Sequence, residues 1–481
     1  MSGSEPHLLE ECPTTPTAGE VVEALTNIVG VDRVLTDAAD RAPFESDWRG
    51  KYRGRCLAVV QPADTREVSK VVEFCARNAV PVVPQGGNTG LCAGATPDSS
   101  GSQIVLSLRR LRRLRAIDAE DGHMVCEAGM PLAEAQNHAE GVGLLLPLSI
   151  ASEGTATIGG VVATNAGGVN VLHYGSARQL LLGLEAVLPD GTIVSRLAPL
   201  RKDNTGYDIV SLLAGSEGTL GIVTAATLAL SPRPLGYTTF LAGLSDVGKA
   251  RAALNHVRSI PGGVVTSWEL FSAVSAELLM QLPQAMPLPL MERHAWYLLG
   301  EISHFGSDNG VLEALADVLA EHDMDDIIVA ASGQQRADLW MIREAVSEAE
   351  RAAGPTLKHD IAVTPARIGE FVEALLPACS SIDAAIRINV FGHVGDGNLH
   401  VNVLPRQEGR ALTGEEQNRF STCIYDLTHE LGGSFSAEHG IGQQKLAQMV
   451  RYKSLAELNL MRTIKGSLDP HGLMNPGKVL P

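Results

Sequence analysis

The clearest alternation of apolar and polar positions lies between residues 57 and 90. Two short apolar runs, LAVVQP and VPVVPQ, flank a stretch in which the apolar residues from Val68 to Cys75 follow the i, i+3, i+4, i+7 spacing of one helix face. Asp64 or Thr65 can cap the start of this helix. The pattern predicts a β-α-β unit that ends in the glycine-rich loop PQGGNTG.

More elements follow after residue 103. QIVLSL predicts a strand, and RAIDAEDGHMVCEAG predicts a β-hairpin with Asp121 and Gly122 at its turn. Pro131 then begins a helix, because proline suits the first helical turn. The basic run LRRLRRLR is interpreted as a solvated exit from the strand.

The density of glycine falls after Pro232 and Pro234. Longer stretches such as RINVFGHVGDGNLHVNVL then predict strands of an antiparallel sheet, and LAELNLMRTIKGSLDP predicts a helix near the C-terminus. We predict an α+β chain with a first domain over 1–234, a second over 235–430 and a C-terminal segment over 431–481.

The stretch FGHVGDGNLHVN places two histidines symmetrically about Asp396 and Gly397. If this Asp-Gly pair forms a two-residue hairpin turn, His393 directly faces His400, with Cβ atoms roughly 5 Å apart. One face of the hairpin is then apolar and the other is mostly polar. Two interpretations stay open from the residues alone, a solvated polar face and a pair of metal ligands.

A third ligand would favour the metal site, and Glu438 in SAEHGIGQQK is the acidic candidate in a similar setting. In a regular strand Glu438 and His439 would point to opposite faces. Both residues can therefore serve one site only if this glycine-containing loop bends around it.

The charge balance excludes one class of partner. The chain of 481 residues has 38 Lys and Arg against 55 Asp and Glu, so a nucleic-acid partner is not expected.

Seven cysteines, with Cys12 the first, are an odd number without a C-x-x-C pair. This pattern favours reduced, mostly buried thiols. Without a basic and apolar leader or a run long enough to span a bilayer, the sequence predicts a cytoplasmic protein.

Two glycine-rich stretches, PQGGNTGL at 84–91 and GTATIGGVVATNAGG at 154–168, suit close approach of backbone N–H groups to an anion. Neither contains the G-x-G-x-x-G or G-K-[ST] motifs of common nucleotide sites. Together the two loops favour a diphosphate ligand, and the alternative is a pair of tight turns.

These stretches, with EAVLPDG, KDNTGYD and GSEGTLGIVT, resemble the FAD-binding domain of the vanillyl-alcohol oxidase and p-cresol methylhydroxylase flavoproteins over roughly residues 50 to 232. The resemblance implies a two-subdomain FAD-binding domain followed by an α+β substrate-binding cap domain. It also implies dissociable FAD, because this chain has Asn88 where members with covalent FAD often carry histidine. The isoalloxazine ring would lie near Asn204, and the adenosine side near Glu217.

The residues that the resemblance places along FAD are Pro84, Gly86, Gly87, Asn88, Thr89, Gly90, Leu91, Gly154, Thr157, Gly159, Gly160, Asn165, Gly167, Gly168, Asn204, Glu217, Gly218, Gly221, Ile222, Val223 and Asn475.

GHVGDGNLH followed by EHGIG resembles the C-terminal signature of the FAD-linked 2-hydroxyacid dehydrogenases. Within that family, GNLHVN is most similar to the D-2-hydroxyglutarate dehydrogenases. The resemblance implies that His393, His400 and Glu438 bind a divalent metal, with zinc preferred, and that His439 is the catalytic base. Two histidines and a carboxylate also match non-haem iron sites, so the ligands alone do not choose the metal.

A cationic anchor for the substrate is expected on the helix at 339–349, where Arg343 and Ser347 are i, i+4 neighbours. Arginine grips a carboxylate in a bidentate manner. In the family that the chain resembles, the matching arginine, hydroxyl residue and lysine contact the substrate carboxylate, and the lysine here is Lys358. Asn402 is a further expected substrate-binding residue.

The implied activity is FAD-dependent oxidation of D-2-hydroxyglutarate to 2-oxoglutarate. FAD-linked oxidation of D-lactate, glycolate or D-malate is an alternative, and a non-catalytic flavin- or metal-binding subunit is another. The expected partners are a small 2-hydroxy dicarboxylic acid, an electron acceptor such as an electron-transfer flavoprotein or a quinone, and a second copy of the chain in a homodimer.

Overall fold

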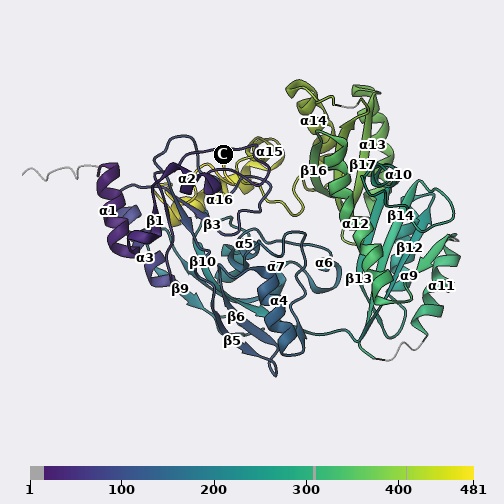
Figure 1. Ribbon diagram of the computed structural model, residues 1–481, viewed down its shortest axis with the longest axis horizontal. Helices are drawn as coiled ribbons and strands as arrows, with labels where there is room; N and C mark the ends of the chain where they lie inside the picture. The colour runs from purple at the N-terminus through teal and green to yellow at the C-terminus, as the bar shows by residue number, and fades with distance from the viewer. Residues whose placement is uncertain (1–15, 307–309, 325, 408) are drawn as a thin grey trace, which may run out of the picture.

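The computed structural model describes residues 16–306, 310–324, 326–407 and 409–481. The chain forms two bodies side by side, one from its N-terminal half with the end of the C-terminal segment and one mainly from residues 236–430 (Figure 1). Each body combines sheets with covering helices, so the predicted α+β class is confirmed.

A four-stranded sheet of order β1-β2-β4-β3 begins the first domain. Its strands are β1 (Val34–Leu35), β2 (Ala58–Val60), β3 (Val82–Gln85) and β4 (Ile104–Ser107), packed with helices α1 (Ala18–Val29) and α3 (Thr65–Arg77). The predicted β-α-β unit is present, with β4 inserted between the parallel strands β2 and β3. Asp64 caps α3, and its carboxylate accepts from the backbone N–H of Glu67 at 2.9 Å. Val68, Val71 and Cys75 are buried as the spacing predicted.

A five-stranded antiparallel sheet of order β5-β6-β10-β8-β9 completes the first domain. The predicted hairpin joins β5 to β6, with Asp118 opposite His123 and a positive φ of 62° at Gly122. Helix α4 (Leu132–Gly141) follows directly after Pro131, as predicted. The strands are β5 (Leu114–Asp118), β6 (His123–Glu127), β8 (Leu181–Val187), β9 (Ile193–Arg196) and β10 (Ile222–Ala229).

Short elements connect these two sheets. The helices are α2 (Ala38–Arg41), α5 (Ile158–Ala163), α6 (Val171–Tyr174), α7 (Ala177–Leu180) and α8 (Ile209–Leu213). Strands β7 (Leu144–Leu145) and β11 (Ser231–Pro232) pair with each other. Three 3-10 turns lie along the whole described chain, at Val31–Arg33, Ala42–Phe44 and Pro365–Arg367.

The cap domain is built on a seven-stranded antiparallel sheet of order β15-β12-β14-β13-β17-β18-β16. Its strands are β12 (Gly236–Leu244), β13 (Gly263–Ser272), β14 (Trp296–His304), β15 (Ile327–Val329), β16 (Leu357–Ala362), β17 (Ile386–His393) and β18 (Asn398–Pro405). The stretch that was predicted to form long antiparallel strands is the β17–β18 pair.

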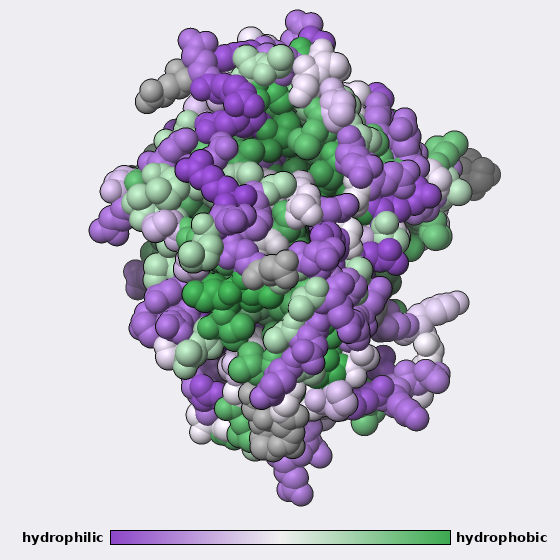
Figure 2. All heavy atoms as spheres, turned by 90° about the vertical axis from the view of Figure 1, so that its right-hand side faces the viewer, coloured by the Kyte–Doolittle hydropathy of each residue, from purple (hydrophilic) through white to green (hydrophobic). Residues whose placement is uncertain are grey.

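Helices cover both faces of the cap sheet. One core lies under α9 (Val247–Val257), α11 (Val311–Glu321), α13 (Ile368–Ile382) and α14 (Gly414–Glu430), and another under α10 (Ala273–Leu279) and α12 (Gly333–Ala353). Seen from the cap side, green apolar residues show between purple polar ones (Figure 2). The cap sheet is therefore buried on both faces, and a polar side chain on it needs a partner from the protein.

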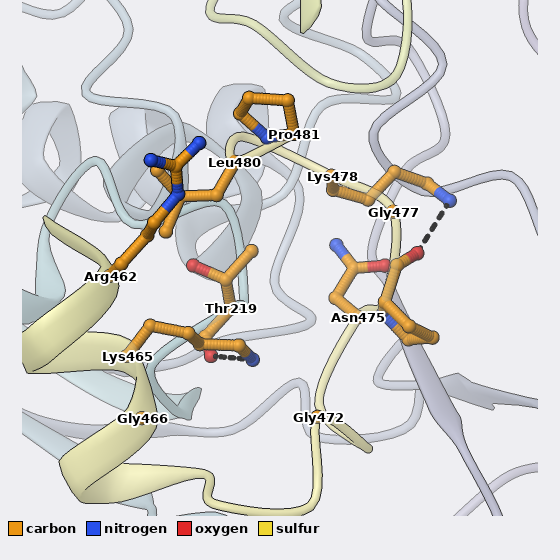
Figure 3. Close-up of a pocket in the computed structure, with 11 residues that line it drawn as sticks. Thr219, Arg462, Lys465, Gly466, Gly472, Asn475, Gly477, Lys478, Leu480 and Pro481 are labelled. Carbon is orange, nitrogen blue, oxygen red and sulfur yellow. Dashed lines mark hydrogen bonds between the residues drawn. The ribbon is translucent and has the colours of Figure 1, made fainter. Parts of the chain in front are cut away.

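The C-terminal segment contacts both bodies, because Met449 and Tyr452 of its first helix pack with the cap core and later residues pack on the first domain. It contains α15 (Leu446–Tyr452) and α16 (Leu455–Leu468), drawn in yellow beside the purple elements of the N-terminus in Figure 1. Met474 pairs with Val82 of β3, and the Lys465 ammonium donates to the carbonyl of Thr219 at 2.7 Å. A small open pocket of about 310 Å³ lies at this junction (Figure 3).

The turn between β17 and β18 differs from the prediction. Phe391, not His393, lies opposite His400, because Asp396 and Gly397 both donate backbone N–H groups to the carbonyl of His393 in a longer loop. The register is thus shifted by two residues, which keeps both histidines on one face as diagonal neighbours. Their ring centroids are 6.3 Å apart.

The prediction of reduced, mostly buried thiols is confirmed for the cysteines among the described residues. Cys56, Cys75, Cys92, Cys126 and Cys379 are free and buried, and Cys423 is partly buried. Cys12 lies outside the described residues. Over the described ranges, no helix is both long and apolar enough to cross a membrane.

The longer hairpin turn depends on Gly397, whose φ is 91° and whose added Cβ would lie 1.9 Å from the carbonyl oxygen of Val363. Gly409 also has a positive φ, of 73°, but a Cβ there would meet nothing within 4 Å. We expect Gly409→Ala to cost about 1 kcal/mol for the strained backbone and Gly397→Ala about 1–3 kcal/mol more for the clash. Thermal unfolding of the two variants measures the difference, and equal melting temperatures would contradict the observed turn.

Candidate active site

A cavity of about 850 Å³ lies between the first domain and the cap. Its walls include both glycine-rich loops, the β17–β18 hairpin, helix α12 and the loop after Phe435. The structure thus brings the two groups of motifs, which are more than 200 residues apart in the sequence, to one place.

The glycine-rich loops pack so tightly that side chains are excluded. A Cβ on Gly87 would lie 2.1 Å from the carbonyl oxygen of Thr155, and one on Gly168 would lie 1.9 Å from that of Ser149. The hydroxyl of Thr157 lines the cavity, is buried, and has no hydrogen-bond partner within the described chain. An elongated ligand with hydrogen-bonding oxygens, such as FAD, fits this wall.

Eighteen of the residues expected along FAD line the cavity. They are Pro84, Gly86, Gly87, Asn88, Thr89, Gly90, Leu91, Gly154, Thr157, Gly159, Gly160, Gly167, Gly168, Glu217, Gly218, Gly221, Ile222 and Val223.

Three expected FAD residues are not among those that line it. The amide oxygen of Asn165 accepts from the hydroxyl of Ser176 and from the backbone N–H of Arg178. This side chain therefore stabilises the second glycine-rich stretch against residues 176–178. Asn204 is exposed, in a polar turn outside the cavity. The Asn475 amide donates to the carbonyls of Gly94 and Glu217, at 3.0 and 2.8 Å, and lies in the C-terminal pocket (Figure 3).

The three expected metal ligands come together. One donor atom each from His393, His400 and Glu438 lies within 4.8 Å of the other two, and the Nε2 atom of His393 is 3.7 Å from a Glu438 oxygen. Two imidazoles and one carboxylate suit zinc or non-haem iron. The residues present therefore fit a divalent metal, and His393 is buried and His400 partly buried, which favours the ligand pair over a solvated polar face.

Each of the two histidines has a buried carboxylate on the neighbouring strand, which the sequence did not reveal. Glu269 of β13 lies opposite His393 and contacts its Nδ1 atom, and Asp360 of β16 lies opposite His400 at 3.9 Å. Such carboxylates orient metal-binding imidazoles and leave the other ring nitrogen free. A lone acidic residue in an apolar strand was the available signal, in TSWELFS and KHDIAV.

Burial and charge act in opposite directions on these groups. Burial lowers the pKa of His400 to about 3, with Asp360 only partly opposing it. For His393 burial also acts downward, but contact with Glu269 outweighs it and raises the pKa to about 9. The pKa of Glu269 falls to about 2 against the burial that would raise it, because His393 and Arg343 stabilise the carboxylate.

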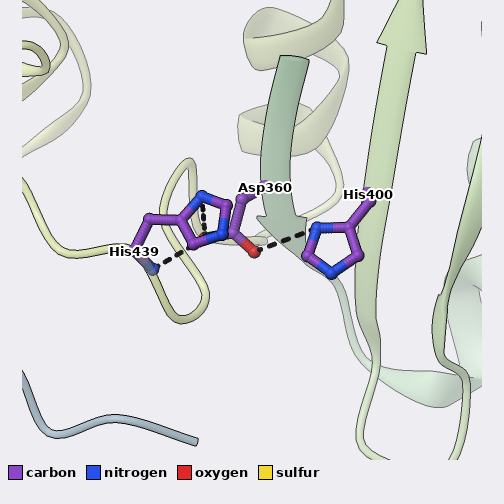
Figure 4. Close-up of side chains that lie close together, drawn as sticks. All are labelled: Asp360, His400 and His439. Carbon is purple, nitrogen blue, oxygen red and sulfur yellow. Dashed lines mark hydrogen bonds and ion pairs between the residues drawn. The ribbon is translucent and has the colours of Figure 1, made fainter. Parts of the chain in front are cut away.

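Asp360 has a second role, because it also holds the loop that carries Glu438 and His439. One oxygen of this carboxylate accepts the backbone N–H groups of Ala437, Glu438 and His439 at 3.2, 2.9 and 3.0 Å. Figure 4 shows Asp360 between the rings of His400 and His439. The loop bends as the sequence analysis required, so that adjacent side chains serve one cavity.

The first domain holds the other half of the same loop. The Glu217 carboxylate accepts from the N–H groups of Ile441 and Gly442 at 2.7 and 2.8 Å. Glu438 in turn accepts from the N–H of Gly168 at 2.7 Å. Glu217 was expected near the adenosine of FAD, and it lines the cavity, but its carboxylate oxygens are used by the loop.

His439 has the properties of a base. Burial lowers its pKa to about 4, although the Asp360 carboxylate, 3.6 Å from its Nδ1 atom, opposes this. The imidazole is therefore neutral at ordinary pH and able to accept a proton.

The expected anchor residues line the cavity but already have partners. Arg343 donates to Glu269 at 2.9 Å, and the Lys358 ammonium donates to Glu350 at 2.9 Å. The amide of Asn402 also donates to both oxygens of Glu350, at 2.8 and 2.9 Å. Ser347 lies on an exposed turn of α12 at the cavity wall.

Comparison with known proteins gives the family. The sequence model of the C-terminal domain of FAD linked oxidases matches residues 236–479, and that of an FAD binding domain matches 56–196. The chain belongs to the FAD-linked oxidases. This FAD-linked oxidase is 34% identical, over 96% of its length and 81% of the relative's, to a probable D-2-hydroxyglutarate dehydrogenase, mitochondrial, of Oryza sativa subsp. indica.

A second relative, D-2-hydroxyglutarate dehydrogenase, mitochondrial, of Bos taurus, is 33% identical over 99% of this chain and 86% of its own. These relatives confirm the resemblance drawn from the C-terminal motifs. The solved structure of p-cresol methylhydroxylase with substrate bound has a TM-score of 0.74 at 16% identity and covers 96% of each chain. The predicted fold family is therefore confirmed.

The predicted cytoplasmic location of this FAD-linked oxidase is wrong, since the rice and cattle relatives are both named mitochondrial. The prediction rested on the lack of a basic and apolar leader pattern and on thiols without a C-x-x-C pair, and reduced thiols do not identify the compartment.

The hydrogen bonds of Asp360 and Glu217 to the loop 437–442 predict which backbone amides are protected from exchange. Because a hydrogen bond to a charged group contributes about 1.5–3 kcal/mol, its loss should speed local amide exchange by roughly 10- to 100-fold. Asp360→Asn should speed amide exchange at residues 437–439, and Glu217→Gln should speed it at residues 441 and 442. Hydrogen exchange of both variants is the measurement, and an unchanged rate at the named amides would exclude this account of the loop.

Proposed function

We propose that this FAD-linked oxidase is a dehydrogenase that oxidises D-2-hydroxyglutarate to 2-oxoglutarate. The observation that carries the proposal is a single cavity with glycine-rich walls for FAD, the His393–His400–Glu438 group and a neutral His439. The names of the rice and cattle relatives support the choice of substrate.

The loops at 84–91 and 154–168 would hold FAD without a covalent bond, and His393, His400 and Glu438 would hold a divalent cation, with zinc as our choice. When bound, these groups supply a hydride acceptor and a Lewis acid for the substrate's carboxylate and hydroxyl oxygens. His439 accepts the proton of the C2 hydroxyl. Asp360 fixes the His439 backbone through its N–H and so holds the imidazole at the cavity wall.

Carboxylate oxygens of the substrate are contacted on the side of the cavity where Arg343, Ser347 and Lys358 lie. Asn402 acts through Glu350, which it shares with Lys358. Closure of the cavity by the two domains excludes water from the reacting atoms. An electron-transfer flavoprotein or a quinone as the electron acceptor, and a homodimer as the working assembly, stay predictions.

Anaerobic mixing tests the activity. The purified yellow protein should lose its flavin absorbance on addition of D-2-hydroxyglutarate, more readily than with D-malate, D-lactate or glycolate. Chelator treatment should prevent the loss, and added divalent metal should restore it. Absence of bleaching by every acid would refute the dehydrogenase, and bleaching that survives metal removal would refute the metal's role.

Two ion pairs, each between a buried glutamate and an arginine of helix α12, test the role of Glu269. Glu269 pairs with Arg343 beside the metal-ligand group, whereas Glu301 pairs with Arg336 at 2.7 Å and does not line the cavity. Glu269→Gln and Glu301→Gln should both lower thermal stability, because each removes the charge of a buried carboxylate from an ion pair with helix α12. Only Glu269→Gln should weaken divalent metal binding, by roughly 10- to 100-fold. Equal metal affinity in the two variants, measured by titration of the chelated protein, would contradict this role.

A further inference from the structure

The Arg and Lys side chains of the cavity wall are each paired with a glutamate, with a single exception within the described chain. Arg343 is paired with Glu269 and Lys358 with Glu350, and both of these glutamates are almost fully buried. Each pair contributes little net charge toward a ligand. A dianionic substrate therefore needs a further cation that the protein has not already neutralised.

Arg49 is that cation. It lines the cavity, is half-buried, and its guanidinium makes neither an ion pair nor a hydrogen bond with any described residue. Burial lowers its pKa from the usual value, with the charges of Asp47 and Glu350 acting in the opposite direction. A desolvated guanidinium without a carboxylate is costly in a folded chain, and a ligand carboxylate would remove that cost.

The loop around Arg49 is built to hold it in place. Asp47 is buried, and its carboxylate accepts the backbone N–H groups of Arg49 and Tyr52 at 3.1 and 2.6 Å. Ser46 pairs with Arg53, and Gly50 has a φ of 66°, which closes a tight turn. The Asp47 carboxylate is thus used by the backbone, and the Arg49 side chain is presented from a fixed base.

Arg49 also lies on the substrate side of the cavity. The cavity that Arg49 lines is also lined by Lys358, Asn402 and His439. Arg49 and Lys358 therefore face the same cavity, whereas Lys51 is not among the residues that line it. The buried carboxylate of Glu350 is not free for Arg49, because Lys358 and Asn402 already use its oxygens.

We propose that Arg49 binds the carboxylate of the substrate that is remote from the reacting carbon, and so selects dicarboxylic over monocarboxylic 2-hydroxy acids. The inference rests on the proposed function and adds its specificity-determining residue. A guanidinium offers two parallel N–H donors to a carboxylate. A substrate that ends in a methyl group would leave Arg49 as desolvated and unpaired as it is in the free protein.

Paired substrates test the proposal in the holoenzyme. D-2-hydroxyglutarate and D-2-hydroxyvalerate share a five-carbon chain and differ at the remote end, a carboxylate in one and a methyl group in the other. Arg49→Gln should lower kcat/KM for D-2-hydroxyglutarate by roughly 10- to 100-fold, mainly through KM, and change that for D-2-hydroxyvalerate less than about 3-fold. Arg49→Lys should fall between wild type and Arg49→Gln.

Lys51→Gln is the matched control, because it removes a neighbouring positive charge from an exposed side chain. It should leave the ratio of the two kcat/KM values close to that of the wild type. Flavin content and melting temperature of each variant report folding. Glutarate, added as a competitive ligand, should bind Arg49→Gln roughly 10- to 100-fold more weakly than wild type, which measures the contact without turnover.

The outcomes separate the two proposals. If the wild type oxidises neither acid, the proposed function fails. If the wild type prefers D-2-hydroxyglutarate and Arg49→Gln keeps that preference and its glutarate affinity, the role of Arg49 is overturned. A loss of equal size for both acids, or an equal loss in Lys51→Gln, would show that general electrostatics and not a contact is responsible, and would overturn it too.

Discussion

Buried carboxylates held by donors of the same chain are the interaction on which this molecule depends. A carboxylate removed from water is tolerated only where hydrogen bonds or cations replace its hydration. Asp360 satisfies this condition with three backbone N–H groups and Glu217 with two, all from one short loop. Since the two carboxylates come from different domains, the shape of that loop is a property of the assembled protein and not of its local sequence.

The same rule explains how far the sequence alone could predict the site. Residues whose type and spacing are distinctive were predicted together, and His393, His400, Glu438 and His439 do line one cavity. Glu269 could not be found in the same way. Its pairing with His393 requires β13 to lie beside β17, and more than 100 residues separate these strands in the chain.

The fold was predictable where local pattern determines it, as in the β-α-β unit with its Asp64 cap. The hairpin shows the limit. Alternation fixed which side chains share a face, but the register depended on the contact of Gly397 with Val363 on the neighbouring chain segment, which no turn rule includes. Asn204, which was expected near the flavin ring, is not among the residues that line the cavity, and a motif gives residue identity but not the path of its loop.

The path of the backbone has a mechanical consequence. The chain passes from the first domain to the cap between β11 and β12, and returns through the segment from Phe435 to α16, which contacts the first domain at Thr219. A body tethered to another at two points turns most easily about the line that joins them. Opening of the cavity should therefore be a rotation of the cap about the line through its two connections to the first domain. The second connection includes the segment that carries His439.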